Sequence, residues 1–244
     1  MGTPPLFLVD ALPQGPAARL DGAEGHHAAA VRRLRPGEPL LLADGAGGVA
    51  DCRVVAVEPG ALRLAVEGVR SLDPPSPRLV LVQALPKGER GELAVELATE
   101  LGVDEIIPWA AARSVMRWEG ARGERSLGRW RSAAREAAKQ SRRPWVPVVT
   151  EPATTGQVAA GIEAAAAALV LHEAASEPLA GAPLPDTGEV LVVVGPEGGV
   201  DDAELAAFVA AGALAVRLGE PVLRTSTAGA AALAALSVRT GRWS

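Results

Sequence analysis

A glycine-rich loop follows one of the most apolar runs of the chain. The run Val190 to Val194 is typical of a buried strand, and it leads into Gly195-Pro196-Glu197-Gly198-Gly199. At the edge of a parallel sheet such a loop lets backbone amides approach a ligand closely, because glycine has no Cβ. The pattern indicates a nucleotide-like ligand. It contains neither a G-x-G-x-x-G fingerprint nor a P-loop, and a tight turn is the alternative interpretation.

A second glycine-containing loop, residues 218–227, carries an arginine at a chemically useful place. It follows a predicted strand and opens into an Ala-rich helix predicted over Ala228 to Val238. Thr225 to Thr227 supply hydroxyls that can cap this helix. Arg224, at the mouth of a parallel sheet, is suited to stabilise negative charge on a substrate. A salt bridge from Arg224 to Glu220 or Glu197 is the alternative.

Two more polar residues are predicted at the same sheet edge. His172 and Glu173 end another predicted strand, so each either lines the pocket or caps a turn. His26 and His27 are adjacent in a predicted helix and point in different directions, which is poor geometry for a shared metal ion. The chain also has one cysteine, Cys52, so an internal disulfide is excluded and a structural zinc cluster is not expected.

Basic residues are concentrated in one part of an otherwise acidic chain. The 244 residues carry a net charge of −5, yet residues 111–145 hold ten basic and three acidic side chains. Within them, a helix predicted over Ser126 to Gln140 has an apolar stripe and, beside it, a basic stripe that can contact phosphate. The apolar stripe is Leu127, Trp130, Ala134 and Ala137, and the basic one is Arg131, Arg135, Lys139 and Arg142. A solvated helix face or a compositional bias toward arginine is the alternative.

The elements that must position these residues fall into two parts. Before residue 72 we expect one helix over Ala23 to Leu34 and a small antiparallel β unit with strands 39–43, 49–57 and 61–69. The proline-rich segment 73–77 breaks every regular pattern and marks a domain boundary. Beyond it, apolar runs alternate with helical segments, which predicts a parallel sheet with helices on both faces. The six predicted strands are residues 79–84, 103–108, 146–149, 168–172, 190–194 and 214–218.

Three helices of the second part have local signals. Leu93, Ala94, Leu97, Ala98 and Leu101 are expected on one apolar face before Gly102. Thr154 with Gln157, and Asp201 with Glu204, have capping-box spacing. The N-terminus does not read as a secretory signal, and the longest apolar stretches, 158–171 and 225–238, are too short for a bilayer. We therefore expect a cytoplasmic protein without a membrane partner.

The sequence resembles the ribosomal small subunit methyltransferase E family, which methylates N3 of one uridine in 16S rRNA with S-adenosylmethionine. The resemblance extends over both parts of the chain in the expected order. The matching segments are residues 31–37, 43–45, 86–90 (Pro-Lys-Gly-Glu-Arg), 99–103 (Thr-Glu-Leu-Gly-Val), 136–143 (Glu-Ala-Ala-Lys-Gln-Ser-Arg-Arg), 195–199 and 223–225 (Leu-Arg-Thr). Two departures are Glu96-Leu97, where relatives commonly have Gln-Lys, and Glu220-Pro221, where they commonly have Pro-Arg.

The resemblance implies an architecture and a cofactor. It implies a PUA-like, RNA-holding β-barrel domain over residues 1–72 and a SPOUT methyltransferase domain, an α/β fold with a trefoil knot, over residues 78–244. It also implies a homodimer with S-adenosylmethionine held in the knot and no metal. The cofactor-binding residues would be Leu171, His172, Gly195, Pro196, Glu197, Gly198, Gly199, Leu218, Gly219, Val222, Leu223 and Thr225.

As a hypothesis, Arg224 and Glu197 are the catalytic residues. Arg224 would stabilise negative charge on the uracil oxygens, and Glu197 would accept the N3 proton or position a water. Phosphate contacts to 16S rRNA or the small ribosomal subunit are assigned to Arg32, Arg33, Lys87, Arg131, Arg135 and Arg142. The alternatives are a SPOUT enzyme for another RNA atom, a non-catalytic RNA-binding module and a small-molecule enzyme.

Overall fold

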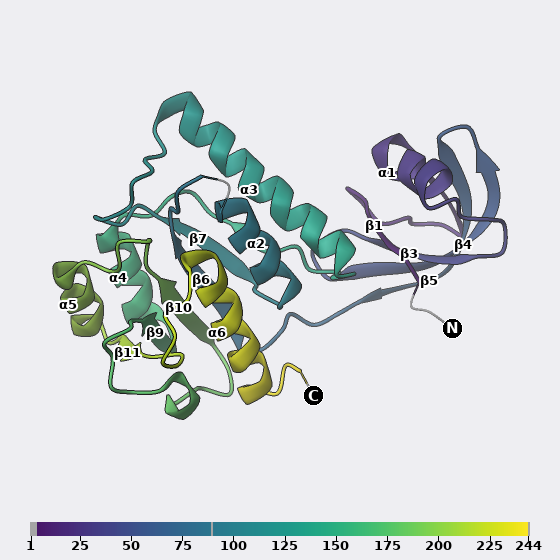
Figure 1. The fold of residues 1–244 in the computed structure, drawn as a ribbon. Coiled ribbons are helices and arrows are strands. Elements are labelled where there is room, and N and C mark those ends of the chain that lie inside the picture. The colour runs from purple at the N-terminus through teal and green to yellow at the C-terminus, as the bar shows by residue number, and fades with distance from the viewer. Residues whose placement is uncertain (1–3, 89, 244) are drawn as a thin grey trace. The chain divides into compact units, whose positions relative to one another are not determined.

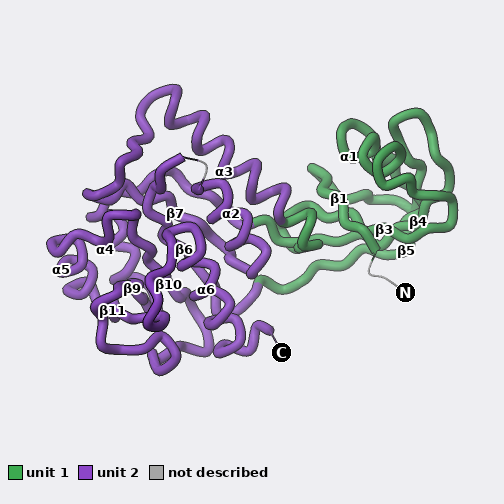
Figure 2. Tube along the Cα trace, in the orientation of Figure 1, with its two compact units in different colours: residues 1–74, 138–146 green, residues 75–137, 147–244 purple. Residues whose placement is uncertain are grey.

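The computed structural model describes residues 4–88 and 90–243, which form two compact units (Figure 1). Unit 1 comprises residues 1–74 and 138–146, and unit 2 comprises residues 75–137 and 147–244 (Figure 2). Glu89 of the predicted 86–90 motif lies outside the described residues. The proposed domain boundary between residues 72 and 78 stays a prediction, and the assignment of 138–146 to unit 1 is a feature that the sequence did not indicate.

Unit 1 is built on a five-stranded sheet with the order β1-β3-β4-β5-β2. The three predicted strands are present as β3 (Pro39–Ala43), β4 (Gly48–Glu58) and β5 (Ala61–Ser71). β1 (Leu6–Leu8) and β2 (Ala17–Leu20) were not predicted. β2 extends the antiparallel ladder of β5, whereas β1 pairs parallel to β3, so the sheet is mixed. The side chains of Phe7, Leu40, Leu42, Leu62 and Leu64 form its core.

The helix predicted over residues 23–34 is shorter than expected. The structure has α1 (Gly22–His26), continued by a π-helical turn η1 (His27–Val31). The helix ends because Arg33 adopts a left-handed backbone with φ 54°. Arg32 and Arg33 therefore lie in the exposed segment that leaves the helix.

Residues 138–146 complete unit 1 from a distant part of the sequence. The ring of Trp145 covers Gly47, whose φ is 91° and whose missing Cβ leaves room for the indole. Lys139 forms an ion pair with Glu24 at 2.6 Å, and both side chains are largely buried. Arg142 also has a left-handed backbone, with φ 56°. The last turn of a long helix and the loop after it therefore pack against the N-terminal segment of unit 1.

Unit 2 contains a six-stranded, entirely parallel sheet with the order β11-β9-β10-β6-β7-β8 (Figure 1). All six predicted strands are confirmed. Their bounds are β6 (Arg78–Ala84), β7 (Glu105–Trp109), β8 (Val148–Val149), β9 (Ala167–Leu171), β10 (Glu189–Val194) and β11 (Leu214–Val216). Because both faces are covered, the central strands consist of continuous apolar runs rather than alternating ones.

Helices cover both faces of this sheet, as predicted. Leu79 and Leu81 of β6 pack in a core with α2, α3 and α6, whereas Val80 and Val82 face the opposite core with α4 and α5. The helices are α2 (Arg90–Glu100), α3 (Gly120–Gln140), α4 (Thr155–Ala164), α5 (Asp202–Ala210) and α6 (Thr225–Arg239), with a short 3-10 turn η2 (Leu179–Gly181). The expected α/β fold class with a small preceding β domain is confirmed. The trefoil knot stays a prediction.

The helix signals were right in most details. Both capping boxes are present, at Thr154 and at Asp201. The buried face of α2 is rotated from the expected one: Leu93 is exposed, and Val95 and Thr99 are buried instead. α2 packs against α6, and Val95 lies in the same core as Leu233 and Leu236 of that helix. In the described part of the chain, no helix has the length and apolarity required to cross a membrane.

Candidate functional site

The two glycine loops line one cavity of about 490 Å³ in unit 2. It lies at the carboxyl ends of β9 and β10, where ligands bind in open parallel sheets. All twelve residues predicted to bind the cofactor line it, as does Arg224. Glu173, for which a pocket-lining role was one of two interpretations, also lines it, and six further lining residues were not assigned from the sequence as site residues: Arg90, Val194, Val200, Arg217, Pro221 and Ala228.

The first loop is compact because its glycines face other parts of the protein closely. A Cβ on Gly195 would lie 2.8 Å from Cγ2 of Val200, and one on Gly198 would lie 3.3 Å from Cβ of Arg113. Gly199 has φ 76°, a conformation that glycine adopts without strain. The loop therefore presents backbone to the cavity, and larger residues at these positions would displace it.

The second loop leads into α6 at Arg224. Arg224 is the N-cap residue of this helix, and its side chain makes no capping hydrogen bond. The expectation that the hydroxyls of Thr225 to Thr227 cap the helix was wrong, because the N-cap residue is Arg224 and the first helical residue is Thr225. Its hydroxyl donates to the backbone oxygen of Gly195 at 2.7 Å, because the first turn of α6 abuts the first loop. Thr227 instead donates to the Arg224 carbonyl at 3.1 Å.

Arg224 is exposed at the cavity and makes no ion pair with any described residue. The two carboxylates that could neutralise it have other partners. Glu220 pairs with Arg217 at 3.5 Å, and Glu197 pairs with Arg90 at 3.5 Å. The charge of Arg224 is therefore available to a ligand, which favours the functional interpretation over the salt bridge.

Glu197 connects the first loop to the segment that follows β6. Besides its ion pair with Arg90, its carboxylate accepts a hydrogen bond from the backbone amide of Lys87 at 3.1 Å. The side chain remains about one third exposed. Glu197 therefore holds two chain segments together and is still partly accessible to solvent.

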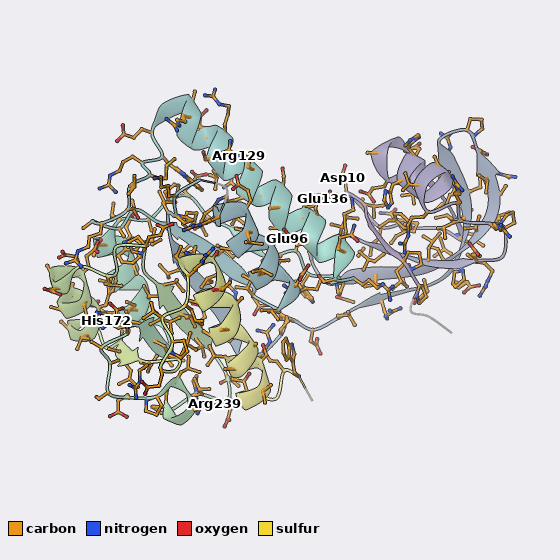
Figure 3. The ribbon with its side chains drawn as sticks, in the orientation of Figure 1. Asp10, Glu96, Arg129, Glu136, His172 and Arg239 are labelled. Carbon is orange, nitrogen blue, oxygen red and sulfur yellow. The ribbon has the colours of Figure 1, made fainter. Side chains whose placement is uncertain are left out.

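His172 combines the two roles considered for it. Its Nδ1 accepts from the amide of Ala174 at 3.2 Å, which caps the turn after β9. Its backbone amide donates to the carbonyl of Val216 at 3.0 Å, so it also links β9 to β11. His172 and Glu173 both line the cavity, and Figure 3 labels His172 among the side chains of unit 2.

A buried carboxylate, that of Glu204, lies in the region that packs behind the first loop. Glu204, at 6% exposure, accepts from the Ala112 amide and from the Thr155 hydroxyl, both at 2.8 Å. The neighbouring Arg113 donates to the carbonyl of Gly198 at 3.3 Å and pairs with Asp201 at 3.1 Å. The capping box predicted the position of Glu204 but not these long-range contacts.

The predicted RNA-binding residues are distributed over both units. Arg32, Arg33 and Arg142 are exposed in unit 1, and Lys87 and Arg131 are exposed in unit 2, where Arg135 is half-buried. Arg131 donates to the Val149 carbonyl and pairs with the exposed Glu151 at 3.0 Å. On the same helix, Arg129, which Figure 3 labels, pairs with Glu92 at 2.7 Å.

The site chemistry is that of a small-molecule pocket with charged groups at its rim. Among the described residues, no cluster of three or more His, Cys, Asp or Glu side chains could hold a metal ion. The cavity volume lies within the range of small-molecule and cofactor sites. Backbone groups of two loops, apolar walls from Leu171, Leu218 and Val222, and three arginines define it.

Two family models match the chain in sequence order. An RNA methyltransferase PUA domain matches residues 20–67, and an RNA methyltransferase domain matches residues 74–237. The first match lies in the β unit of unit 1. The second contains every residue that lines the cavity.

Similar proteins extend over nearly the whole chain. A Mycobacterium bovis protein named ribosomal RNA small subunit methyltransferase E is 51% identical over 243 residues, with 98% of this chain and 93% of that protein covered. Its namesake from Bacillus subtilis is 29% identical, with 93% and 92% covered. The crystal structure of the Neisseria gonorrhoeae protein of that name, bound to S-adenosyl methionine, is 27% identical and has a TM-score of 0.84, with 97% and 98% covered.

Proposed function

Because the chain belongs to the ribosomal RNA small subunit methyltransferase E family, we propose that it transfers a methyl group from S-adenosylmethionine to N3 of one uridine in 16S rRNA. Transfer of a methyl group to ribosomal RNA is the activity of the family. The choice of uridine N3 is the finer part of the proposal. The observation that supports it best is the cavity that both glycine loops line, together with Arg224, which makes no ion pair with a described residue.

The residues of the cavity fit this cofactor. The open backbone of residues 195–199 offers hydrogen-bonding groups, and Leu171, Leu218 and Val222 provide apolar surface for an adenine ring. When bound, S-adenosylmethionine supplies a methyl group on a sulfonium centre. We infer that the first loop and residues 218–223 hold it, with the carboxylates of Glu173 and Glu197 favouring its positive charges.

The acceptor must be brought into line with that methyl group. Uridine N3 lies on the Watson–Crick edge and bears a proton, so the base has to be unpaired or extruded before it enters the cavity. Arg224 would then stabilise the negative charge that spreads to the uracil oxygens as the N3 proton leaves. Glu197, whose side chain is about one third exposed, is the proposed acceptor for that proton or positions a water that accepts it.

The RNA would be held through its phosphates by basic residues of both units. The proposed contacts are Arg32, Arg33, Lys87, Arg131, Arg135 and Arg142. The ion pair of Arg131 with Glu151 does not oppose this role, since an exposed pair contributes at most about 1 kcal/mol and can exchange for a phosphate. Residues 1–72 would act mainly in holding RNA and residues 78–244 in catalysis.

Family membership also supports a homodimer that acts in the cytoplasm on rRNA or the small ribosomal subunit. A non-catalytic RNA-binding module is disfavoured because the cavity and Arg224 are both intact. A small-molecule enzyme leaves the basic segment 111–145 without a role. A methyltransferase for another RNA atom is the main rival, because a cofactor pocket does not determine which nucleotide atom lies opposite it.

Nucleoside mass spectrometry tests the proposal directly. The purified protein, S-adenosylmethionine and 30S subunits lacking the modification should yield 3-methyluridine in the 16S rRNA. Subunits without the protein provide the background. Appearance of another methylated nucleoside would support the rival enzyme, and absence of any product with well-folded protein would contradict catalysis.

A further inference from the structure

A buried chain of hydrogen bonds connects three elements beside the cavity. Gln83, near the end of β6, is 0% exposed and is the register partner of Val194 in β10. Its Nε2 donates to the Thr225 hydroxyl at 3.0 Å, and that hydroxyl donates to the carbonyl of Gly195 at 2.7 Å. These two hydrogen bonds therefore join β6, the first glycine of the first loop and the first turn of α6.

Neighbouring groups determine which atoms donate and which accept in these hydrogen bonds. Nε2 of Gln83 also donates to the Ala84 carbonyl at 3.1 Å, and because a carbonyl can only accept, the nitrogen must face it. The Thr225 hydroxyl then accepts from Gln83, and its single hydrogen is directed to Gly195. Thr225 lines the cavity, yet its hydroxyl is engaged by protein atoms.

Burial of the Gln83 side-chain amide costs folding free energy. We therefore expect this amide to have a role that offsets the cost. Oε1 of Gln83 is buried and has no hydrogen-bond partner in the described structure. An unsatisfied buried acceptor destabilises the fold, and an apolar side chain of similar shape would avoid that cost. What the amide gains at this position is its bond to the Thr225 hydroxyl.

α6 also approaches the sheet unusually closely at this point. A Cβ on Gly229, one turn after Thr225, would lie 3.1 Å from Leu81 of β6 and 3.5 Å from Val194 of β10. The absence of a side chain at Gly229 allows the first turn of α6 to reach Gly195. Close packing and the hydrogen-bond chain thus act on the same turn.

We propose that Gln83 and Thr225 are positioning residues that hold the two loops of the methyl-donor site in place before the donor binds. Their hydrogen bond to the Gly195 carbonyl fixes the start of the first loop. They also fix Arg224, because Arg224 directly precedes Thr225 in the polypeptide. A site assembled in advance binds its ligand with less loss of conformational entropy and keeps the reacting groups aligned. This inference rests on the proposed function, because the ligand it concerns is S-adenosylmethionine.

Substitutions of the two side chains in this series of hydrogen bonds, Gln83 and Thr225, test the inference in the full-length protein. Thr225→Val replaces the hydroxyl by a methyl group, Thr225→Ser retains it, and Gln83→Met removes the amide donor. By isothermal titration calorimetry with S-adenosylmethionine, we expect Thr225→Val and Gln83→Met each to weaken donor affinity about tenfold, with Thr225→Ser close to wild type. The double variant should lose little more than either single one, because both remove the same connection.

Thr99→Val is a matched control for the loss of a buried hydroxyl. Thr99 is 0% exposed, and its hydroxyl donates to the Val95 carbonyl at 2.7 Å within α2. This variant should retain wild-type donor affinity even where its melting temperature falls. In steady-state assays, Thr225→Val should raise KM for the donor as well as lower kcat, whereas a merely structural loss of folded enzyme would lower kcat alone.

The outcomes separate the inference from the proposed function. If the wild type produces no heat with saturating S-adenosylmethionine, the proposed function fails. If the wild type binds and Thr225→Val or Gln83→Met binds equally well, or if Thr225→Ser loses as much as Thr225→Val, the positioning role is refuted while the function stands. Should the variants not fold, amide hydrogen exchange of the wild type decides: residues 197–200 and 225–228 should open as one unit without donor, and independent opening would refute the role.

Discussion

The carboxylate of Glu197 accepts a hydrogen bond from the backbone amide of Lys87 at 3.1 Å, and the same carboxylate pairs with Arg90. A residue proposed as proton acceptor is thus also a connection between the first glycine loop and the chain after β6. These two roles respond differently to substitution, so they can be separated by experiment.

Glu197→Gln distinguishes the two roles. A glutamine can still accept from the Lys87 amide through its Oε1 but cannot take up the N3 proton. If Glu197 is the proton acceptor, kcat should fall roughly a hundredfold or more, a larger effect than the loss of donor affinity that removal of its negative charge causes. The comparison is Glu220→Gln, the same change in an exposed glutamate of the second loop that does not line the cavity. Retention of kcat in Glu197→Gln would leave Glu197 with the connecting role alone.

Arg224→Ala should affect chemistry far more than cofactor binding. The guanidinium has no acidic partner among the described residues, so its removal leaves no buried charge uncompensated. We expect kcat to fall roughly a hundredfold or more, since a positioned charge on the transition state is lost. Calorimetry should find donor affinity within about threefold of wild type. Near-native methylation of 30S subunits by Arg224→Ala would show that another group stabilises the uracil oxygens.

The sequence predicted those parts of the fold whose signals are local. The six strands of unit 2 are continuous apolar runs, and the capping boxes at Thr154 and Asp201 depend on residues three positions apart. β1 was missed because three residues carry no periodicity and its pairing with β3 is long-range. The helical pattern of α3 continues through residues 138–140, so nothing local indicates that Trp145 packs on Gly47.

In the candidate site, too, the sequence predicted the features that have local signals and missed those that depend on long-range contacts. Glycine loops at predicted strand ends identified the cavity, because their backbone positions follow from sheet topology alone. Gln83 was treated as one residue of a buried strand, although a lone amide in an otherwise apolar run was a usable signal. Its partner Thr225 is 142 positions away, and no spacing rule connects the two.

The N-terminal half of α3 extends the proposed RNA surface beyond the residues assigned from the sequence. Arg122 and Arg125 are exposed, and neither has an ion-pair partner in the part of the chain that the structure describes. Replacing both by alanine should weaken RNA binding and reduce the slope of log affinity against log salt by about 1 to 2. Arg63→Ala is the control for the loss of an exposed positive charge, since Arg63 lies in β5 and outside the basic segment 111–145. Fluorescence anisotropy with a 16S fragment at several salt concentrations measures this, and an unchanged slope would exclude both arginines from the surface.

Cys52 should be chemically inert in the folded protein. Burial raises the pKa of its thiol from 9.0 to about 11, and the nearby Asp51 and Glu67 carboxylates add to the effect. At pH 8 a thiol reagent should label native protein far more slowly than urea-unfolded protein, because the thiolate is the reactive form. Labelling at equal rates would mean that the thiol is accessible.

The same thiol gives a pH dependence of stability with a definite sign. Between pH 9 and about 11 the unfolded chain loses the Cys52 proton while the folded chain keeps it. The unfolded state then binds fewer protons, so the free energy of unfolding falls as pH rises through this window and is unaffected by Cys52 below it. Urea unfolding of wild type and Cys52→Ala at several pH values tests this. The decline should be smaller in the variant, and parallel curves would contradict the raised pKa.

Gly47→Ala should destabilise unit 1 strongly. A Cβ at this position would overlap the indole of Trp145, and φ of 91° is unfavourable for any residue with a side chain. Displacing the ring and straining the backbone should together cost roughly 2 to 4 kcal/mol. Gly68→Ala is the matched control in β5, because apart from its two chain neighbours no described residue has an atom within 4 Å of the place its Cβ would take, and no positive φ is required there. Its effect on the free energy of unfolding should stay within about 0.5 kcal/mol. Chemical denaturation followed by tryptophan fluorescence measures both, and equal stability of the two variants would contradict the packing of Trp145 on Gly47.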